Sequence, residues 1–305
     1  EGVIVNVIRP LPDVPGIEHR YVDTARMRFH VAQAGSGLPV LLLHGWPQHW
    51  WSWRKVLPLL ANDHLVICPD LRGAGWSDAP KEGYRTENLV DDVLALLDTL
   101  GLPQVLVVGH DVGGRIGFHL SLRAPERVSA LVTLNAMHPY WRARSLAGQA
   151  WRFWWTPLVE TTLVGRWVLR RIPAVTRMVF RLGHSRGVLS PAEIAEYVAS
   201  VREPARARAG ERLMHEFAYR EIVPTLLGRN RSRRLTVPTL MLHGTRNAAR
   251  TARSLRGYEP YADELHIQMI DGAGQWLPEQ CPDTVAYAVR EFGRRLESTA
   301  AGRMA

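Results

Sequence analysis

Short, continuous runs of apolar residues recur along the chain and predict the strands of a buried sheet. The runs cover residues 39–43, 65–68, 105–108, 130–134, 239–242 and 265–270. Strands that are buried on both faces of a parallel sheet have this continuous apolar pattern. Amphipathic segments with helical spacing, such as 88–100 and 114–123, lie between several of these runs. The alternation predicts an α/β fold with a mostly parallel, doubly wound sheet.

Two parts of the chain depart from this alternation. In residues 17–34, β-favouring runs flank a turn at Asp23-Thr24 and predict an antiparallel hairpin. Residues 137–234 contain no good strand run, but they hold five tryptophans and have helix-like spacing throughout. We therefore expect an α/β core formed by residues 1–136 and 235–305, with a mainly helical cap, or lid, at 137–234.

The net charge of +9 does not change this picture. Lys55 and Lys81 are the only lysines among 38 basic residues, and the arginines are scattered over the whole chain. Without a recognition module, we expect no nucleic-acid partner. No apolar run approaches about twenty residues, so we expect no membrane partner. Cys68 and Cys281 form no metal-ligand spacing, which favours a cytoplasmic protein without metal or cofactor. A homodimer is compatible with the sequence.

The most informative motif for chemistry is the segment Gly109-His110-Asp111-Val112-Gly113, which directly follows a predicted strand. Small residues on both sides of a central residue permit the sharp strand-to-helix turn known as a nucleophile elbow. The helix that follows points its N-terminus at the central side chain and favours negative charge there. An aspartate at this place can attack carbon and form a covalent ester. Asp111 is therefore the candidate catalytic residue.

A second motif, His44-Gly45-Trp46-Pro47, follows the predicted strand at 39–43. In an architecture with a nucleophile elbow, the corresponding loop supplies one backbone N–H of an oxyanion site. Pro47 has no N–H, so Trp46 is the expected donor. The N–H of Val112 is expected to be the second.

These two motifs, together with the segment 70–78 (Asp-Leu-Arg-Gly-Ala-Gly-Trp-Ser-Asp), resemble the epoxide hydrolase and haloalkane dehalogenase branch of the α/β hydrolases. The resemblance implies an α/β-hydrolase fold and an enzyme that acts on a small molecule through Asp111. In haloalkane dehalogenases a tryptophan commonly follows the nucleophile. Because Val112 occupies that place here, the epoxide hydrolase side is favoured.

The resemblance also locates the two residues that normally activate water. The acid is expected in the segment 242–247, where Asn247 stands, and the histidine in Gly272-Ala-Gly-Gln275-Trp276, where Gln275 stands. Some relatives carry the acid after the strand that precedes the cap, but that place holds Asn135 here. Hydrolysis of an ester intermediate needs a base to take a proton from water. We therefore expect a degenerate triad and poor hydrolysis of simple epoxides and esters.

Three interpretations of this loss compete. Asp111 is reassigned to acid/base chemistry on a substrate that needs no hydrolytic water; or His138 or Asp271 replaces the lost base; or the chain is a non-catalytic binding protein or an inactivated variant. The first interpretation is favoured, because the elbow and the oxyanion loop both survive. It predicts addition, cyclisation or ring opening.

The substrate is predicted only from the aromatic content of the segments expected to face the cleft between core and cap. Aromatic walls suit large planar ligands, so we expect a bulky aromatic or polycyclic substrate of the kind found in secondary metabolism. The resemblance places the tyrosines that protonate an opening epoxide in the cap, with Met214 at one such position. The candidate substrate-binding residues are His110, His138, Tyr140, Trp141, Trp154, Trp155, Met214 and Tyr219.

Overall fold

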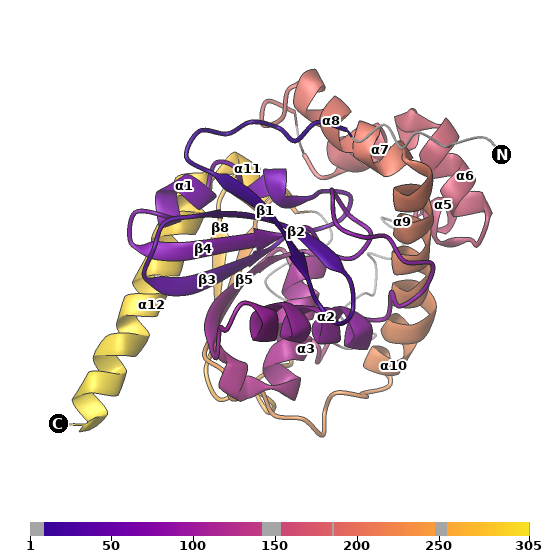
Figure 1. Cartoon of the computed structure of the whole chain (residues 1–305). Helices are drawn as coiled ribbons and strands as arrows, with labels where there is room; N and C mark the ends of the chain where they lie inside the picture. Colours follow the sequence, from indigo (N-terminus) through magenta and orange to yellow (C-terminus); the bar gives the residue numbers. More distant parts are fainter. Residues whose placement is uncertain (1–8, 142–153, 185, 248–254, 305) are drawn as a thin grey trace.

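An eight-stranded sheet runs through the centre of the molecule (Figure 1). The computed structural model describes residues 9–141, 154–184, 186–247 and 255–304. The strands are β1 (Glu18–Asp23), β2 (Arg28–Ala34), β3 (Leu38–Leu43), β4 (His64–Pro69), β5 (Val105–His110), β6 (Val128–Leu134), β7 (Thr239–Gly244) and β8 (Leu265–Ile270). Their order in the sheet is β1-β2-β4-β3-β5-β6-β7-β8.

The pairing of the strands confirms the predicted α/β class and the mostly parallel sheet. The strands from β4 to β8 in this order pair in parallel, whereas β1 pairs antiparallel with β2, and β2 with β4. The predicted hairpin is confirmed by the register of β1 and β2, in which Asp23 lies opposite Arg28. Its two strands lie at one edge of the sheet, outside the parallel part that carries the elbow.

Alternate residues of each strand enter one of two apolar layers. On one face, Leu41 and Leu43 pack with helices α2 (Thr86–Thr99) and α3 (Val112–Arg123). On the other face, Val40 and Leu42 pack with α1 (Leu57–Leu60) and α12 (Pro282–Met304). Because both faces are covered, the inner strands such as β5 and β7 are buried on both sides, which explains their continuous apolar runs, whereas the edge strands β1 and β8 are partly exposed. The short helices η1 (Trp50–Trp53), η2 (Pro125–Arg127) and α11 (Leu277–Gln280) complete the core.

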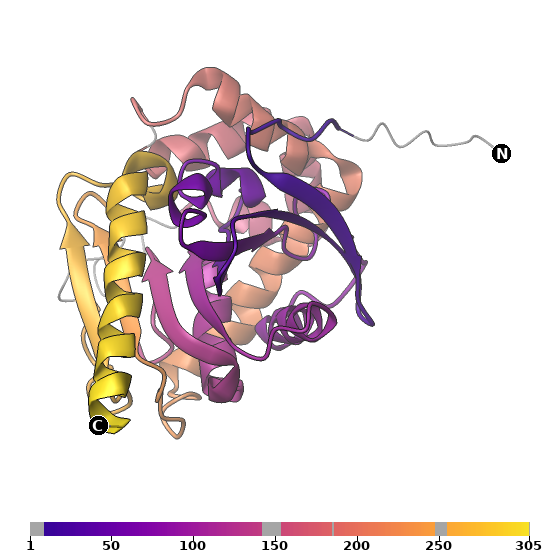
Figure 2. The same cartoon turned by 60° about the vertical axis from the view of Figure 1, so that its left-hand side comes forward.

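A group of helices lies between β6 and β7 in the sequence and on one side of the sheet in space (Figures 1 and 2). They are α5 (Pro157–Glu160), α6 (Val164–Arg171), α7 (Pro173–Leu182), α8 (Pro191–Arg202), α9 (Pro204–Glu216), the π-helix η4 (Phe217–Ile222) and α10 (Val223–Leu226). Among the described residues of 154–234 there is no strand. The domain limits at 137 and 234 stay a prediction.

Buried polar contacts tie this helical group to the core. The Tyr197 hydroxyl of α8 donates a hydrogen bond to Glu279 Oε1 of α11 at 2.7 Å. Arg54 Nη1 donates to the same oxygen at 2.6 Å. Burial raises the pKa of Glu279, while the hydrogen bonds from Arg54 and Tyr197 oppose that rise. Removing one partner from such a cluster leaves a buried polar group unpaired, at a cost of about 3–5 kcal/mol for a buried ion pair.

Candidate active site

The elbow at Asp111 is a strained turn between β5 and α3. Asp111 has φ 50° and ψ −108°, a backbone conformation that side-chain-bearing residues rarely adopt. The neighbouring glycines are required by close backbone contacts. A Cβ atom at Gly109 would lie 2.4 Å from the Gly113 carbonyl oxygen, and one at Gly113 would lie 2.1 Å from the Leu43 carbonyl oxygen. The turn therefore presents the Asp111 side chain at the end of the central strand.

The loop after β3 places one predicted oxyanion donor beside this carboxylate. The Trp46 N–H donates a long hydrogen bond to Asp111 Oδ2, at 3.4 Å. The Val112 N–H belongs to the first turn of α3, where N–H groups have no partner within the helix. The structure thus brings Trp46, Asp111 and Val112 together. Their role in catalysis stays a prediction.

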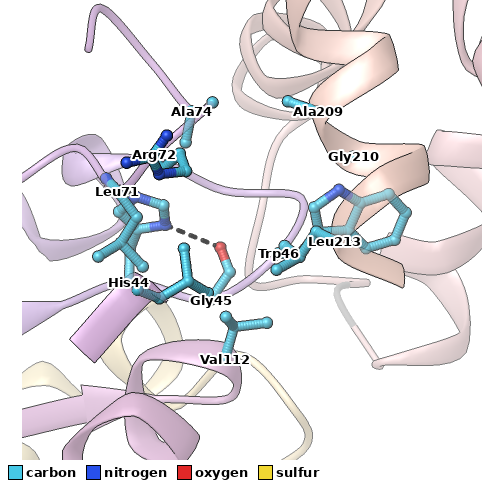
Figure 3. A pocket seen from close by; sticks show the side chains of 12 residues that line it. His44, Gly45, Trp46, Leu71, Arg72, Ala74, Val112, Ala209, Gly210 and Leu213 are labelled. Atoms are coloured by element: carbon cyan, nitrogen blue, oxygen red, sulfur yellow. Dashed lines mark hydrogen bonds between the residues drawn. The ribbon is translucent and has the colours of Figure 1, made fainter. Parts of the chain in front are cut away.

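His44 stabilises the shape of this loop. Its Nδ1 lies 2.9 Å from the Gly45 carbonyl oxygen, drawn as the dashed line in Figure 3. Its Nε2 accepts a hydrogen bond from the Leu71 N–H at 3.0 Å. Burial lowers the pKa of His44, so the ring is neutral with a proton on Nδ1. A neutral ring with both nitrogens engaged serves the loop rather than proton transfer.

The side chains of Asn247 and Gln275 contact one another. Asn247 Nδ2 donates a hydrogen bond to Gln275 Oε1 at 2.6 Å. The Gln275 carbonyl oxygen lies 2.8 Å from His110 Nε2, next to Asp111 in the chain. This contact places the loop that carries Gln275 beside the elbow. Two amides therefore occupy the positions at which the family resemblance predicts an acid and a histidine.

Asn135 holds the same loop, a role that the sequence analysis missed. Its Nδ2 donates to the carbonyl oxygens of Gly274 and Gln275, both at 2.8 Å, and its Oδ1 accepts from the Gly244 N–H at 3.2 Å. Asn135 has φ 48°, and asparagine is among the few residues enriched in that region. The residue thus ties the end of β6 to the segments that follow β7 and β8.

A small pocket lies between helix α9 and the core loops (Figure 3). Its volume is about 30 Å³, enough for one or two water molecules. Trp46 and Val112 line it from the core, and Ala209, Gly210 and Leu213 line it from α9. A Cβ atom at Gly210 would lie 3.0 Å from Trp46 Nε1, so α9 packs directly against the loop.

Some predicted substrate-binding residues lie near this pocket. The Trp155 ring stacks on the Trp46 ring, with centroids 6.5 Å apart and planes 9° apart. Met214 packs in the same apolar cluster as both tryptophans. His110 is buried beside the elbow. None of these three candidates lines the pocket itself, so their contact with a substrate stays a prediction.

Others lie elsewhere. Trp154 and Tyr219 expose 60% and 57% of their surface to solvent, Trp141 is buried, and none of the three lines the pocket. Tyr140 is buried, and its hydroxyl donates to the Arg233 carbonyl oxygen at 3.0 Å. Stacking of its ring on Tyr261, with centroids 5.0 Å apart, places it in core packing. These contacts give no support to Tyr140 as a substrate-binding residue.

The two candidate replacement bases have structural partners. His138 Nε2 donates to the Leu255 carbonyl oxygen at 2.9 Å, and its Nδ1 accepts from the Tyr140 N–H at 3.1 Å. Burial lowers the pKa of His138 to about 4. Asp271 is exposed and accepts a hydrogen bond from the Thr245 hydroxyl at 3.1 Å. Neither arrangement leaves a base facing Asp111.

Arg115 is a further charged residue near Asp111 that the sequence analysis did not consider. It follows Asp111 by one turn of α3, and its guanidinium lies over the Phe217 ring, 4.4 Å from the centroid. Burial lowers the pKa of Arg115, whereas attraction to Glu221 and Asp111 opposes that change. The i, i+4 spacing from the elbow is the sequence signal that points to it. Arg115 therefore supplies positive charge behind the elbow.

A family model described as the alpha/beta hydrolase fold matches residues 39–259. The chain belongs to the α/β-hydrolase fold family. This α/β hydrolase is 29% identical over 287 residues to the soluble epoxide hydrolase of Corynebacterium sp. (strain C12), across 90% of this chain and 97% of that protein. It is 28% identical over 297 residues to the fluoroacetate dehalogenase of Burkholderia sp., across 91% and 94% of the two chains.

A solved structure supports the same assignment. The α/β hydrolase superposes on the epoxide hydrolase CorEH with a TM-score of 0.77 and 27% identity, covering 92% of this chain and 99% of the other. The predicted resemblance to the epoxide hydrolases is thereby confirmed. The protein is an epoxide hydrolase-like enzyme of the α/β-hydrolase fold.

The crowding at the elbow predicts that Gly113→Ala destabilises the protein by about 1–3 kcal/mol, because the added methyl group meets the backbone of Leu43. Gly293→Ala is a matched control in helix α12, where the added Cβ would lie 3.6 Å from its nearest neighbour. We expect that control to be stabilising by about 0.5–1 kcal/mol. Denaturant unfolding measures both variants, and equal effects would contradict the steric argument.

The burial of His138 predicts a loss of stability in acid. The folded pKa of about 4 lies below the ordinary value of 6.5, so the unfolded chain binds the proton first. The contribution of His138 is complete above pH 6.5 and is lost as the pH falls toward 4, by about 3 kcal/mol in total. His138→Gln should remove this part of the pH dependence while the other histidines stay unchanged. If the free energy of unfolding falls by the same amount in the native protein and in His138→Gln between pH 6.5 and pH 4, the prediction is wrong.

Proposed function

We propose that this enzyme uses Asp111 for acid/base chemistry on a bulky aromatic or polycyclic substrate, in an addition, cyclisation or ring opening that consumes no water. The observation that carries the proposal is the 2.6 Å hydrogen bond between the amides of Asn247 and Gln275. An amide does not accept a proton from water at neutral pH. An ester formed on Asp111 would therefore lack the base that its hydrolysis requires.

A cyclisation illustrates the proposed use of the surviving residues. A substrate hydroxyl gives its proton to the Asp111 carboxylate while its oxygen attacks an epoxide carbon and the epoxide C–O bond breaks. The epoxide oxygen gains negative charge against the N–H groups of Trp46 and Val112, and then takes the proton from Asp111. The product is an isomer of the substrate, so neither water nor a cofactor is consumed.

The surviving residues can supply two known contributions to the rate of such a reaction. A positioned acid/base group contributes on the order of 10²–10⁴ in rate. One oxyanion donor contributes on the order of 10²–10³. The Trp46 N–H lies 3.4 Å from the Asp111 carboxylate, so a substrate oxygen bound beside this pair is within reach of both groups.

The stacked rings of Trp46 and Trp155 support an aromatic substrate, because flat apolar walls favour planar ligands. The pocket of about 30 Å³ is much smaller than the roughly 300–1,000 Å³ of ordinary ligand sites. Binding of a ring system therefore requires α9 to move away from Trp46. The movement would separate Gly210 from the Trp46 indole. This contact itself contains no ion pair.

Replacing Asp111 is expected to abolish the proposed reaction. With an aryl-substituted hydroxy epoxide in water labelled with oxygen-18, the native enzyme should form a cyclic ether without the label. Asp111→Asn keeps the size of the side chain, so it should lower the rate by about 10²–10⁴ while affinity changes little. Product analysis by mass spectrometry measures both outcomes.

Asp271→Asn is the matched control, because this exposed turn residue should not affect the rate. A labelled diol as the main product, or an Asp111→Asn variant with most of the native rate, would contradict the proposal. A stable mass increment on Asp111 after incubation would support the nucleophilic alternative instead.

Introducing a histidine at position 275 and a carboxylate at position 247 is expected to create hydrolysis. The native enzyme should convert styrene oxide to its diol more slowly than about 1 per second, the lower end of ordinary enzyme rates. Gln275→His combined with Asn247→Asp should raise that rate by about 10²-fold, because the two side chains already lie within hydrogen-bonding distance. Gln275→His alone should give less, since its imidazolium lacks a carboxylate. No gain in the double variant would show that the loop geometry differs from that of a hydrolase.

A further inference from the structure

The segment 154–167, which includes helix α5 and the start of α6, carries five large exposed apolar side chains. We call this surface the cap patch; it consists of Trp154, Leu158, Leu163, Val164 and Trp167. Leu163 and Trp167 expose 65% and 57% of their surface. Soluble monomers seldom expose apolar side chains of this size in one group, and such groups mark interaction sites.

The apolar side chains of the patch are not required for packing within the cap. The inner faces of α5 and α6 bury a separate apolar set, Val159, Val168 and Leu169. That inner set packs toward α9. In Figure 1, α5 and α6 lie on the far side of α9 from the sheet. The helices that carry the patch therefore lie at the outer edge of the helical group.

The surroundings of the patch are strongly basic. Residues 154–190 contain six arginines and a single acidic residue, Glu160. Glu160 is buried, so its carboxylate is not part of the exposed surface. Arg170 and Arg171, at the end of α6, and Arg177, on α7, are exposed. An anionic partner is the electrostatic complement of this surface.

The patch is also held rigidly in its exposed position. Leu163 has φ 70°, a conformation that costs a non-glycine residue about 1–3 kcal/mol. The buried carboxylate of Glu211 on α9 accepts hydrogen bonds from the N–H groups of Leu163 and Arg166, at 3.0 and 3.2 Å. The Arg166 guanidinium binds the same carboxylate at 2.7 and 2.9 Å. The Leu163 side chain is thus displayed by a fixed turn.

We propose that the cap patch docks the protein onto an anionic lipid surface. Tryptophan and leucine insert at the boundary between headgroups and acyl chains, and arginine binds lipid phosphates. No helix among the described residues has the length and apolar character to cross a bilayer. The proposed association is therefore interfacial. It departs from the expectation of no membrane partner, which rested on the lack of a long apolar run.

A second copy of the chain fits this surface less well. A symmetric dimer places the same patch on both sides of its interface. The arginines around one patch would then face those around the other, and like charges at an interface are unfavourable. A lipid surface supplies negative charge and adapts to the projecting side chains. It does not require a matching cavity.

Co-sedimentation with vesicles tests the proposal on the full chain. The native protein should bind vesicles of phosphatidylcholine containing about 30 mol % phosphatidylglycerol, bind phosphatidylcholine alone far more weakly, and dissociate as salt rises. Trp154→Ser with Trp167→Ser, and separately Arg170→Gln with Arg171→Gln, should each reduce binding by about tenfold or more. Both pairs are exposed, so circular dichroism should show an unchanged fold.

Matched controls distinguish the patch from the net charge of +9. Leu38→Ser with Tyr287→Ser removes equally exposed apolar side chains from a surface outside the cap patch. Arg294→Gln with Arg295→Gln removes exposed positive charge from α12. Each control pair should stay within about twofold of the native protein.

Three results would overturn the proposal. The first is absence of binding to the anionic vesicles. The second is an equal loss in the control variants and the patch variants. The third is a different occupant of the patch. It would be shown by a dimer in sedimentation velocity that Trp154→Ser with Trp167→Ser abolishes, or by an affinity for immobilised polyglutamate equal to the affinity for the anionic vesicles. None of these readouts involves enzymatic activity, so they are independent of the proposed reaction.

Discussion

Close backbone contact at the elbow is the constraint on which the rest of the site depends. A Cβ atom at Gly45 would lie 2.8 Å from Asp111 Cβ, and one at Gly114 would lie 2.3 Å from Ala136 Cβ. The loop after β3, the turn after β5 and the segment after β6 therefore meet with no space for side chains. Because the contacts are steric, they position the Asp111 carboxylate independently of the reaction it serves. The N–H groups of Trp46 and Val112, the pocket and the loop at Gln275 are all arranged around this point.

The helices between β6 and β7 combine apolar packing with buried polar contacts. The sheet is stabilised by apolar layers on both faces, whereas α8 and α6 are each linked to neighbouring elements by a buried carboxylate, Glu279 and Glu211 respectively. Directional contacts of this kind fix the register of one helix against another. The contact between α9 and Trp46 is apolar and tight, and the Arg208 side chain of the same helix donates a hydrogen bond to the Ala79 carbonyl oxygen.

Much of the fold could be predicted from the sequence because its strands are buried on both faces. Strands β3 to β8 correspond to apolar runs in the sequence, and the spacing of Gly109 and Gly113 predicts the elbow. The surroundings of the site could be predicted less well. Trp154 and Trp155 are adjacent and chemically identical, yet one is exposed and the other stacks on Trp46. That difference depends on the helix ends and on contacts between distant segments.

Roles that depend on long-range hydrogen bonds were also not predictable from local patterns. Glu211 resembles an ordinary solvated residue in an arginine-rich helix, but it is fully buried because it binds a turn 45 or more positions away. The sequence indicated only that Asn135 occupies a position at which some relatives carry the catalytic acid. Its contribution became evident from contacts with residues more than 100 positions away.

The hydrogen bonds of Asn135 have an evolutionary consequence. They reach only main-chain atoms of Gly244, Gly274 and Gln275, so they do not depend on which side chains occupy positions 247 and 275. The loops that carry the reactive groups of this fold can therefore accept substitutions while keeping their shape. A lineage could exchange one chemistry for another by a few point mutations, and each intermediate would still be a folded protein exposed to selection.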